Sequence, residues 1–259
     1  MNDALEAFRR ERLAAREALV TDGEAAALGR QWMNRVNPLK YPYQFDWLGR
    51  PVIQYPQDVV AVQELVWRTR PTLIVETGIA HGGSLVLSAS LLALLELCEA
   101  AATGGTVDPR RPRGKALGID VDIRPHNRRL IEDHPLSGRI EMLEGSSVAP
   151  DVLAAVGARV KGEPRVLVAL DSNHTHEHVL AELEAYAGFV TPGSYLVACD
   201  TVIADLDPGL FPDRPWGHGD NPRTAVEQFL KGHPEFEVDH EFDKFLVGSN
   251  PGGYLRRIA

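Results

Sequence analysis

The fold is decided by residues 73–84, which read Leu73-Ile74-Val75-Glu76-Thr77-Gly78-Ile79-Ala80-His81-Gly82-Gly83-Ser84. A short apolar, β-branched run ends in a carboxylate, a glycine-rich turn follows, and an apolar helical pattern then extends to about Ala102. This order predicts a strand, a loop and a helix. Because ligands bind at the carboxyl ends of the strands in an open α/β sheet, the loop predicts a small-molecule cofactor site.

The glycines of this loop allow positive φ and close approach of a ligand to the backbone. The helix that follows offers free N–H groups in its first turn. We therefore expect cofactor contacts from Glu76, Gly78, His81, Gly82 and Ser84. For His81, ordering of the loop is an equally good interpretation.

Composition and charge exclude several classes of partner. The 259 residues suit one large domain, or one domain with an extension. A formal net charge of −9 argues against nucleic acid, because phosphate contacts require clustered Lys and Arg. Cys98 and Cys199 lie in apolar segments, so we expect a reducing cytoplasm and no disulfide framework. No secretory signal is visible, and no apolar run reaches the roughly 18 residues of a membrane helix, so no membrane contact is expected.

The chain divides into an N-terminal extension, residues 1–56, and a domain that covers residues 57–259. The extension has a helical pattern over residues 3–35, followed by an aromatic and Pro-rich segment, residues 38–56. We expect this segment to be an arm packed on the domain or on a second subunit, which suggests a homo-oligomer. Direct contact with substrate is the alternative.

Strand and helix patterns alternate along the domain, which predicts a parallel sheet with helices on both faces. Five strands are expected at residues 72–76, 115–120, 138–143, 165–171 and 194–200. Two closely spaced patterns at 235–241 and 244–248 predict an antiparallel hairpin. We therefore predict a Rossmann-like α/β fold of the class I methyltransferase type, with a mostly parallel seven-stranded sheet and an antiparallel last strand.

Four of the predicted strands end in acids, namely Glu76, Asp120, Asp171 and Asp200. The ends of parallel strands share one edge of the sheet, so these carboxylates converge there. Such convergence is costly unless a cation or a polar ligand is bound. Capping of the following helix explains any one of these acids, but not all four together.

Asp120, at the end of the second strand, suits the two vicinal hydroxyls of a ribose, and Asp122 follows in the same loop. A dehydrogenase also uses an acid at that position, but its G-x-G-x-x-G fingerprint is absent. The wider glycine spacing favours S-adenosylmethionine over a dinucleotide. After the third strand, Ser146 and Ser147 either bound an adenine ring or cap the next helix.

Asp171 and Asp200 follow neighbouring strands and offer the hard oxygen ligands that suit Mg²⁺. A metal there would lower the pKa of a substrate hydroxyl, which is what O-methylation requires. His174 lies about one turn beyond Asp171 and is the candidate general base. With His176 and His178 it forms an H-x-H-x-H run, but alternate residues of an incipient helix do not face one zinc ion.

These motifs resemble the cephalosporin hydroxylase family over residues 45–256. The matching blocks are Glu76-Thr77-Gly78, His81-Gly82-Gly83-Ser84, Gly118-Ile119-Asp120-Val121-Asp122, Leu170-Asp171-Ser172-Asn173-His174, Pro56-x-Asp58 and Asn250-Pro251-x-Gly253. Despite that name, its members are class I S-adenosylmethionine-dependent methyltransferases of antibiotic pathways, with relatives that O-methylate sugars. The resemblance implies Mg²⁺ at Asp171 and Asp200. One departure is Cys199, where the family often has an acid, so a third oxygen from Asn173 or Asp205, or catalysis without metal, is expected.

The prediction is an S-adenosylmethionine-dependent O-methyltransferase that acts on a hydroxyl of a small natural product, such as a sugar or glycosylated metabolite. Asp171 and His174 would be catalytic, and the loop around Trp216 could close over substrate. Two alternatives stay open. One is a non-catalytic helper of a two-component system, which is compatible with Cys199 in place of an acid. The other is an NAD-dependent oxidoreductase.

Overall fold

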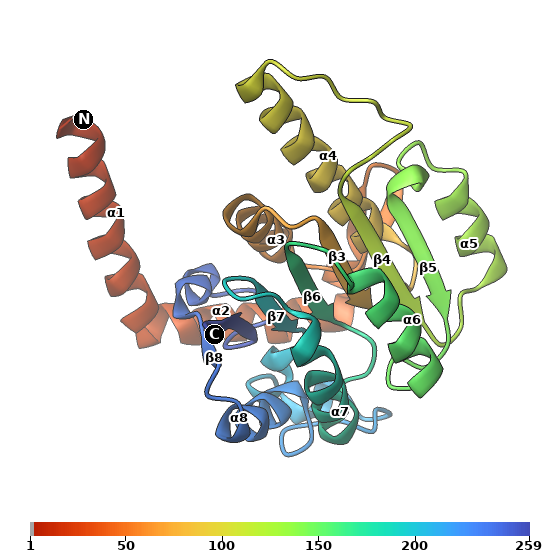
Figure 1. Ribbon diagram of the computed structural model, residues 1–259. Coiled ribbons are helices and arrows are strands. Elements are labelled where there is room, and N and C mark those ends of the chain that lie inside the picture. The colour runs from red at the N-terminus through yellow and green to blue at the C-terminus, as the bar shows by residue number, and fades with distance from the viewer. Residues whose placement is uncertain (1–2) are drawn as a thin grey trace.

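The computed structural model describes residues 3–259 and shows a central sheet covered by helices on both faces (Figure 1). Apolar side chains of α3 and α4 pack on one face, joined at its edge by α5, while α6, α7 and α8 pack on the other. The bounds of these helices are Pro56–Thr69 for α3, Gly83–Thr103 for α4, Pro125–Glu132 for α5, Pro150–Val160 for α6, His176–Tyr186 for α7 and Pro222–Gly232 for α8.

The sheet has seven strands in the order β5-β4-β3-β6-β7-β9-β8. Their bounds are Leu73–Thr77 for β3, Lys115–Asp120 for β4, Ile140–Glu144 for β5, Val166–Leu170 for β6, Tyr195–Ala198 for β7, Phe236–Val238 for β8 and Tyr254–Arg257 for β9. All neighbours from β5 to β7 are parallel, and β9 runs antiparallel to both β7 and β8. The predicted fold class is confirmed.

The predicted strand at residues 244–248 is wrong. A 3₁₀ helix, η7 (His240–Phe245), ends within that segment, the rest of the segment is not in a strand, and the last strand starts only at Tyr254. Phe242 is buried and stacks on Tyr254 with ring centroids 4.3 Å apart. The apolar run therefore packs its aromatic rings against the core instead of pairing its backbone, and β8 and β9 are joined by a long connection, not a tight hairpin.

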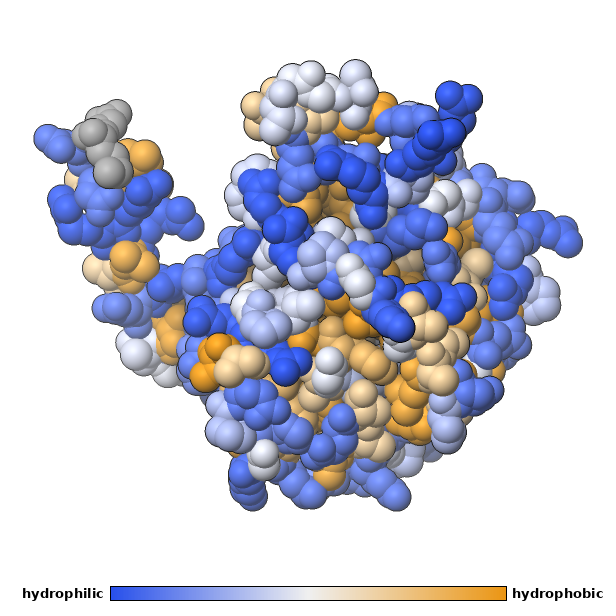
Figure 2. Space-filling model, viewed as in Figure 1, coloured by the Kyte–Doolittle hydropathy of each residue, from blue (hydrophilic) through white to orange (hydrophobic). Residues whose placement is uncertain are grey.

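The N-terminal helical pattern forms two helices, α1 (Asp3–Thr21) and α2 (Gly23–Val36), instead of the single helix expected. Asp22 separates them because its side chain accepts hydrogen bonds from the N–H groups of Glu24 and Ala25 and so caps α2. Helix α1 projects from the body of the protein, buries none of its residues, and leaves apolar side chains on its surface (Figures 1 and 2).

Residues 37–55 are more regular than the Pro-rich sequence predicts. Two 3₁₀ turns, η1 (Asn37–Leu39) and η2 (Tyr41–Gln44), lead into a hairpin of β1 (Phe45–Trp47) and β2 (Arg50–Val52). The indole N–H of Trp47 donates to Ser90 Oγ at 2.9 Å, which fixes the hairpin to α4. This segment is thus an arm on the domain, as one of the two interpretations expects.

Helix α4 is, among the described residues, the one helix long and apolar enough to cross a membrane. The sequence alone suggested no such span. Of its most apolar window, 61% is buried inside the protein, where it covers the sheet. A helix that is apolar nearly all round fits the centre of a large core equally well.

Candidate active site

The loop between β3 and α4 lies against the end of β6. Gly78 has φ +88°, and a Cβ atom there would lie 2.0 Å from the carbonyl oxygen of Asp171. Only glycine therefore allows the two strand ends to meet. The contact also fixes Asp171 beside the glycine loop, so the predicted cofactor and metal residues share one place.

Glu76 lies beneath this loop and is buried. Its carboxylate accepts hydrogen bonds from Ser84 Oγ at 2.6 Å and Ser88 Oγ at 3.4 Å. Burial raises the pKa of Glu76 to about 7, and the two serine hydroxyls only partly oppose this shift. The structure gives Glu76 and Ser84 a mutual bond that orders the start of α4.

A cavity of about 270 Å³ opens on the β4 side of the loop. Asp120 lines it and accepts hydrogen bonds at Oδ2 from the N–H groups of Ile79 and Ala80, at 2.8 and 3.2 Å. Asp122 is exposed and donates its N–H to Asp120 Oδ1. The other lining residues are Gly78, Ile119, Val121, Gly145, Ser146, Ser147, Ser172, Asn173 and His178.

The serines after β5 line this cavity, and neither caps α6, whose N-cap is Ala149 without a side-chain bond. The capping interpretation is therefore wrong. Ser147 Oγ lies 3.2 Å from His178 Nε2, and the buried Glu182 lies beyond that ring. His178 was not among the predicted site residues, although its hydrogen bond with Glu182 raises its pKa and it lines the cavity.

A second cavity, of about 50 Å³, lies on the other side of Gly78. His81, Ser84 and Asp171 line it, together with Pro51, Ile53 and Gln54 of the N-terminal arm. The buried Arg50 donates to the carbonyl oxygen of His81 and to Asn127 Oδ1, so the arm also fixes the glycine loop. Gly82 lines neither cavity and instead packs on α5.

Asp171, His174 and Asp200 meet at the carboxyl ends of β6 and β7. One potential ligand atom from each lies within 4.8 Å of the others, and His174 Nε2 is 3.2 Å from Asp200 Oδ2. Burial raises the pKa of Asp171 well above its usual range, and the charge of Asp200 raises it further. A cation bound between the two carboxylates would relieve both effects, and their oxygens suit Mg²⁺.

The residues expected to complete this site have other partners. Asn173 Oδ1 accepts from Thr175 N and Thr175 Oγ1, and Asp205 forms a bidentate pair with Arg223. The expectation of a third oxygen from either residue is therefore not met in this structure. Cys199 is buried in the apolar cluster of α3 and α4 and does not belong to the ligand group. The third group that the structure supplies is the imidazole of His174.

The three histidines of the H-x-H-x-H run point to different partners. His174 faces Asp200, His176 bonds Thr224 and Gln228 of α8, and His178 faces Ser147 and Ser172. They cannot share one zinc ion in this arrangement. The ring of Trp216 packs edge-on against His174 with centroids 4.9 Å apart, so the loop after β7 contacts one member of the cluster.

The family is shown by comparison of the sequence with family models. The model of the family described as rhamnosyl O-methyltransferase/CmcI matches residues 39–258. The chain belongs to this family. The predicted S-adenosylmethionine-dependent O-methyltransferase is thereby confirmed as the enzyme class, and methyl transfer is favoured over hydride transfer and over a non-catalytic role.

Curated relatives and solved structures agree with this assignment. A rhamnosyl O-methyltransferase of Mycobacterium tuberculosis is 28% identical over 207 residues, 77% of this chain and 73% of that protein. Its Mycobacterium leprae counterpart is 26% identical over 221 residues, 82% of each chain. An apo structure of CmcI has a TM-score of 0.53 at 17% identity and covers 84% of this chain and 77% of its own. CalS11, a TDP-rhamnose 3'-O-methyltransferase of calicheamicin biosynthesis, has 0.52 at 18% identity, covering 77% and 78%. At these identities the structures establish the fold.

Proposed function

We propose that the protein transfers the methyl group of S-adenosylmethionine to a hydroxyl group of a sugar or a glycosylated small molecule, with Mg²⁺ at Asp171 and Asp200. The observation that carries this proposal is the cluster of Asp171, His174 and Asp200 beside the two cavities of the glycine loop. The rhamnosyl and TDP-rhamnose transferases among the relatives support a sugar acceptor. A CmcI structure with Mg and SAM supports the two cofactors.

The two cavities suggest how the methyl donor lies. Its adenosine would occupy the larger cavity, with Asp120 at the ribose and Ser146 and Ser147 at the base. Its methionine part would pass over Gly78 into the smaller cavity, between His81, Ser84 and Asp171. The reactive methyl group then comes to the acid cluster, because Asp171 lines that cavity and also belongs to the cluster.

Asp171 and Asp200 would hold Mg²⁺, which when bound would lower the pKa of the acceptor hydroxyl. His174 Nε2 would take the hydroxyl proton while the oxygen–methyl bond forms and the sulfur–methyl bond breaks. The products are the methyl ether, S-adenosylhomocysteine and a protonated imidazole. Trp216 packs against the His174 ring and would hold it toward the acceptor.

The experiment uses TDP-rhamnose and a rhamnosylated glycoside as acceptors and detects the methylated product and S-adenosylhomocysteine by mass spectrometry. His174→Gln should lower the rate about 10²- to 10⁴-fold and leave the calorimetric affinity for S-adenosylmethionine unchanged. The control is His233→Gln, since His233 pairs with Glu184 and Glu235 away from the cluster. Absence of S-adenosylmethionine binding would refute the whole proposal. A loss of Mg²⁺ affinity in His174→Gln would make His174 a ligand instead of a base.

The setting of the enzyme is also part of the proposal. We propose a cytoplasmic homo-oligomer that acts in natural-product biosynthesis of the antibiotic kind. Helix α1 supports the oligomer, because most helical stability in proteins comes from packing of an apolar face, and α1 has no buried residue in the single chain. A second subunit that covers Leu5, Phe8 and Leu13 would stabilise it. Sedimentation of the full chain against one lacking residues 1–21 tests this.

A further inference from the structure

Asp200 has an unusual backbone conformation for a residue with a side chain. Its φ is +55° and its ψ is +26°, in the left-handed region that favours glycine. A residue stays in this region only where its surroundings hold it there. The conformation turns the chain directly after β7 and sets the direction in which the Asp200 carboxylate leaves the backbone.

The segment 249–251 holds this turn. The N–H of Asp200 donates to Asn250 Oδ1 at 2.9 Å, and the side chain of Asn250 is buried. Thr201 Oγ1 donates to the carbonyl oxygen of Pro251 at 2.8 Å, and Val202 N donates to that of Ser249 at 3.0 Å. Three consecutive residues from Asp200 onward are thus bonded to three consecutive residues of one distant segment.

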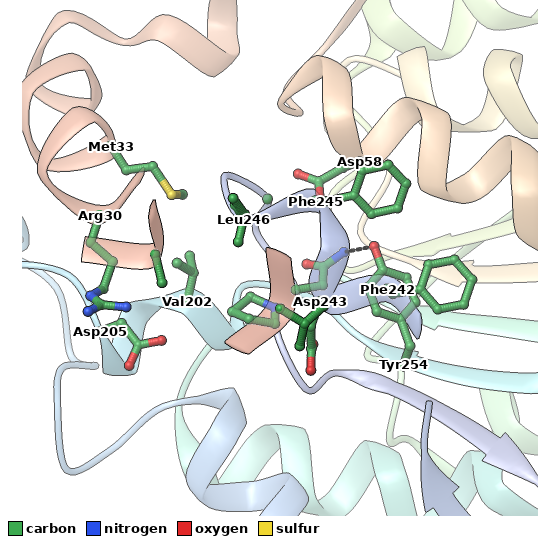
Figure 3. A pocket seen from close by; sticks show the side chains of 15 residues that line it. Arg30, Met33, Asp58, Val202, Asp205, Phe242, Asp243, Phe245, Leu246 and Tyr254 are labelled. Carbon is green, nitrogen blue, oxygen red and sulfur yellow. Dashed lines mark hydrogen bonds between the residues drawn. The ribbon is translucent and has the colours of Figure 1, made fainter. Parts of the chain in front are cut away.

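Asp58, on α3, binds the backbone of segment 249–251 through its carboxylate. Its buried carboxylate accepts from Ser249 N at both oxygens, at 3.1 and 2.9 Å. The Asn250 amide also donates to the Tyr254 hydroxyl at 3.4 Å, the bond drawn as a dashed line at Tyr254 in Figure 3, where Asp58 is also labelled. Gly248 allows the close approach, because a Cβ there would lie 2.7 Å from Asp58 Oδ1.

We propose that Asn250, supported by Asp58, is a positioning residue that holds Asp200 in the geometry needed for cation binding. This inference rests on the proposed metal site and extends it to residues outside the ligand cluster. Asn250 binds the backbone of Asp200 and touches no potential metal ligand atom, so its effect reaches the cation only through the Asp200 main chain. Partners of this kind typically change metal affinity about 10- to 100-fold when they are removed.

The test measures Mn²⁺ binding by electron paramagnetic resonance, with Mg²⁺ as competitor, in the full chain. Asn250→Ala should weaken Mn²⁺ binding at least about 10-fold and leave S-adenosylmethionine affinity without metal unchanged. Asn250→Ser, which is polar but too short to reach the Asp200 N–H, should lose as much and serves if the alanine variant does not fold. Asn250→Asp keeps an oxygen that can accept from the Asp200 N–H and should keep the Mn²⁺ affinity of the wild type.

The control is Tyr195→Phe at the start of β7, the end of that strand away from Asp200; it removes the hydrogen bond that the buried Tyr195 donates to Asp239 and the one that it accepts from Arg68. Its Mn²⁺ affinity should equal that of the wild type. Wild-type affinity in folded Asn250→Ala or Asn250→Ser would overturn the inference, as would an equal loss in Tyr195→Phe or in Asn250→Asp. Failure of the wild type to bind Mn²⁺ or Mg²⁺ would instead refute the metal site of the proposed function.

Discussion

Buried acids have opposite surroundings at the two ends of the central strands. At the amino ends of the strands, Glu96 and Arg139 are both buried and their side chains meet at 2.6 Å. Burial is the largest influence on the pKa of Glu96 and would raise it, but the hydrogen bonds and charges of Arg139 and Arg113 together hold that pKa below its usual range. Arg139 also donates to the carbonyl oxygen of Gly114, so this pair is well satisfied.

At the carboxyl ends, Glu76, Asp58 and Asp171 have no Lys or Arg partner among the ion pairs of residues 3–259. Burial raises the pKa of each, to about 7 for Glu76 and Asp58. The acid at the amino ends is therefore paired, whereas the acids at the carboxyl ends are not, and a cation bound at Asp171 and Asp200 would relieve part of the unfavourable electrostatic energy there. Such retained strain is expected at a functional site.

The largest change in the free energy of unfolding should follow from removing the buried Glu96–Arg139 pair. Glu96→Ala leaves Arg139 as an unpaired buried cation and should lower the free energy of unfolding by about 3–5 kcal/mol. Urea unfolding measures this change. Arg113→Ala is the control, because its side chain is 63% exposed beside the same Glu96 and its loss should cost less than about 1 kcal/mol. Equal losses of stability in Glu96→Ala and Arg113→Ala would show that the buried pair matters no more than the exposed one.

The free energy of unfolding should rise when a cation binds at Asp171 and Asp200. Mg²⁺ at about 100 times its dissociation constant should raise the free energy of unfolding by about 2.7 kcal/mol, and EDTA should reverse the gain. Asp200→Asn should abolish the response, since it removes one of the two carboxylates. Thermal unfolding with and without Mg²⁺ checks both, and a response kept in the variant would place the cation elsewhere.

The pH dependence of stability tests the raised pKa of Glu76 when the wild type is compared with a Glu76 variant, because Asp58 and Asp171 also have raised pKa values. Its folded pKa, about 7, lies above the ordinary value of 4.5, so the folded state binds more protons between these two values. Stability should therefore fall as pH rises across that window, by about 1–3 kcal/mol for this group. Glu76→Gln should reduce the slope of the stability curve measured by urea unfolding from pH 4.5 to 8, and the remaining slope belongs to the other buried acids such as Asp58. An unchanged slope would show that Glu76 does not titrate in this range.

The smallest effect should come from the surface. Glu237 and Arg256 pair at 3.4 Å across β8 and β9, with side chains about half exposed. Glu237→Gln should change the free energy of unfolding by about 0.5 kcal/mol or less. The same urea measurements check it, and this variant also controls for Glu76→Gln. A loss above about 1 kcal/mol would mean that exposed pairs matter here as much as buried ones.

The sequence predicted the central strands and the acids that end them, because apolar runs, glycine turns and strand-end acids are local signals. It missed contacts made across long separations. Asp58 and Asn250 stood in matching motifs, yet their link through Ser249 joins residues 191 positions apart. The prediction of a strand at 244–248 was wrong for a related reason. An apolar run in the sequence does not show whether its backbone pairs in a sheet or only its side chains pack in the core. Cys199, at which the sequence raised doubt, lies in the core cluster and outside the ligand group.

The position of β9 has a consequence for how the protein folds. Strand β9 pairs with both β7 and β8. Strand β8 can therefore join the sheet only after residues 254–257 have been synthesised. Asn250, which holds the Asp200 turn, comes only a few residues earlier. A nascent chain could thus assemble β3 to β7 while still lacking the segment that shapes the cation site. Loop closure over such separations is slow compared with local pairing, so cation affinity should appear among the last events of folding.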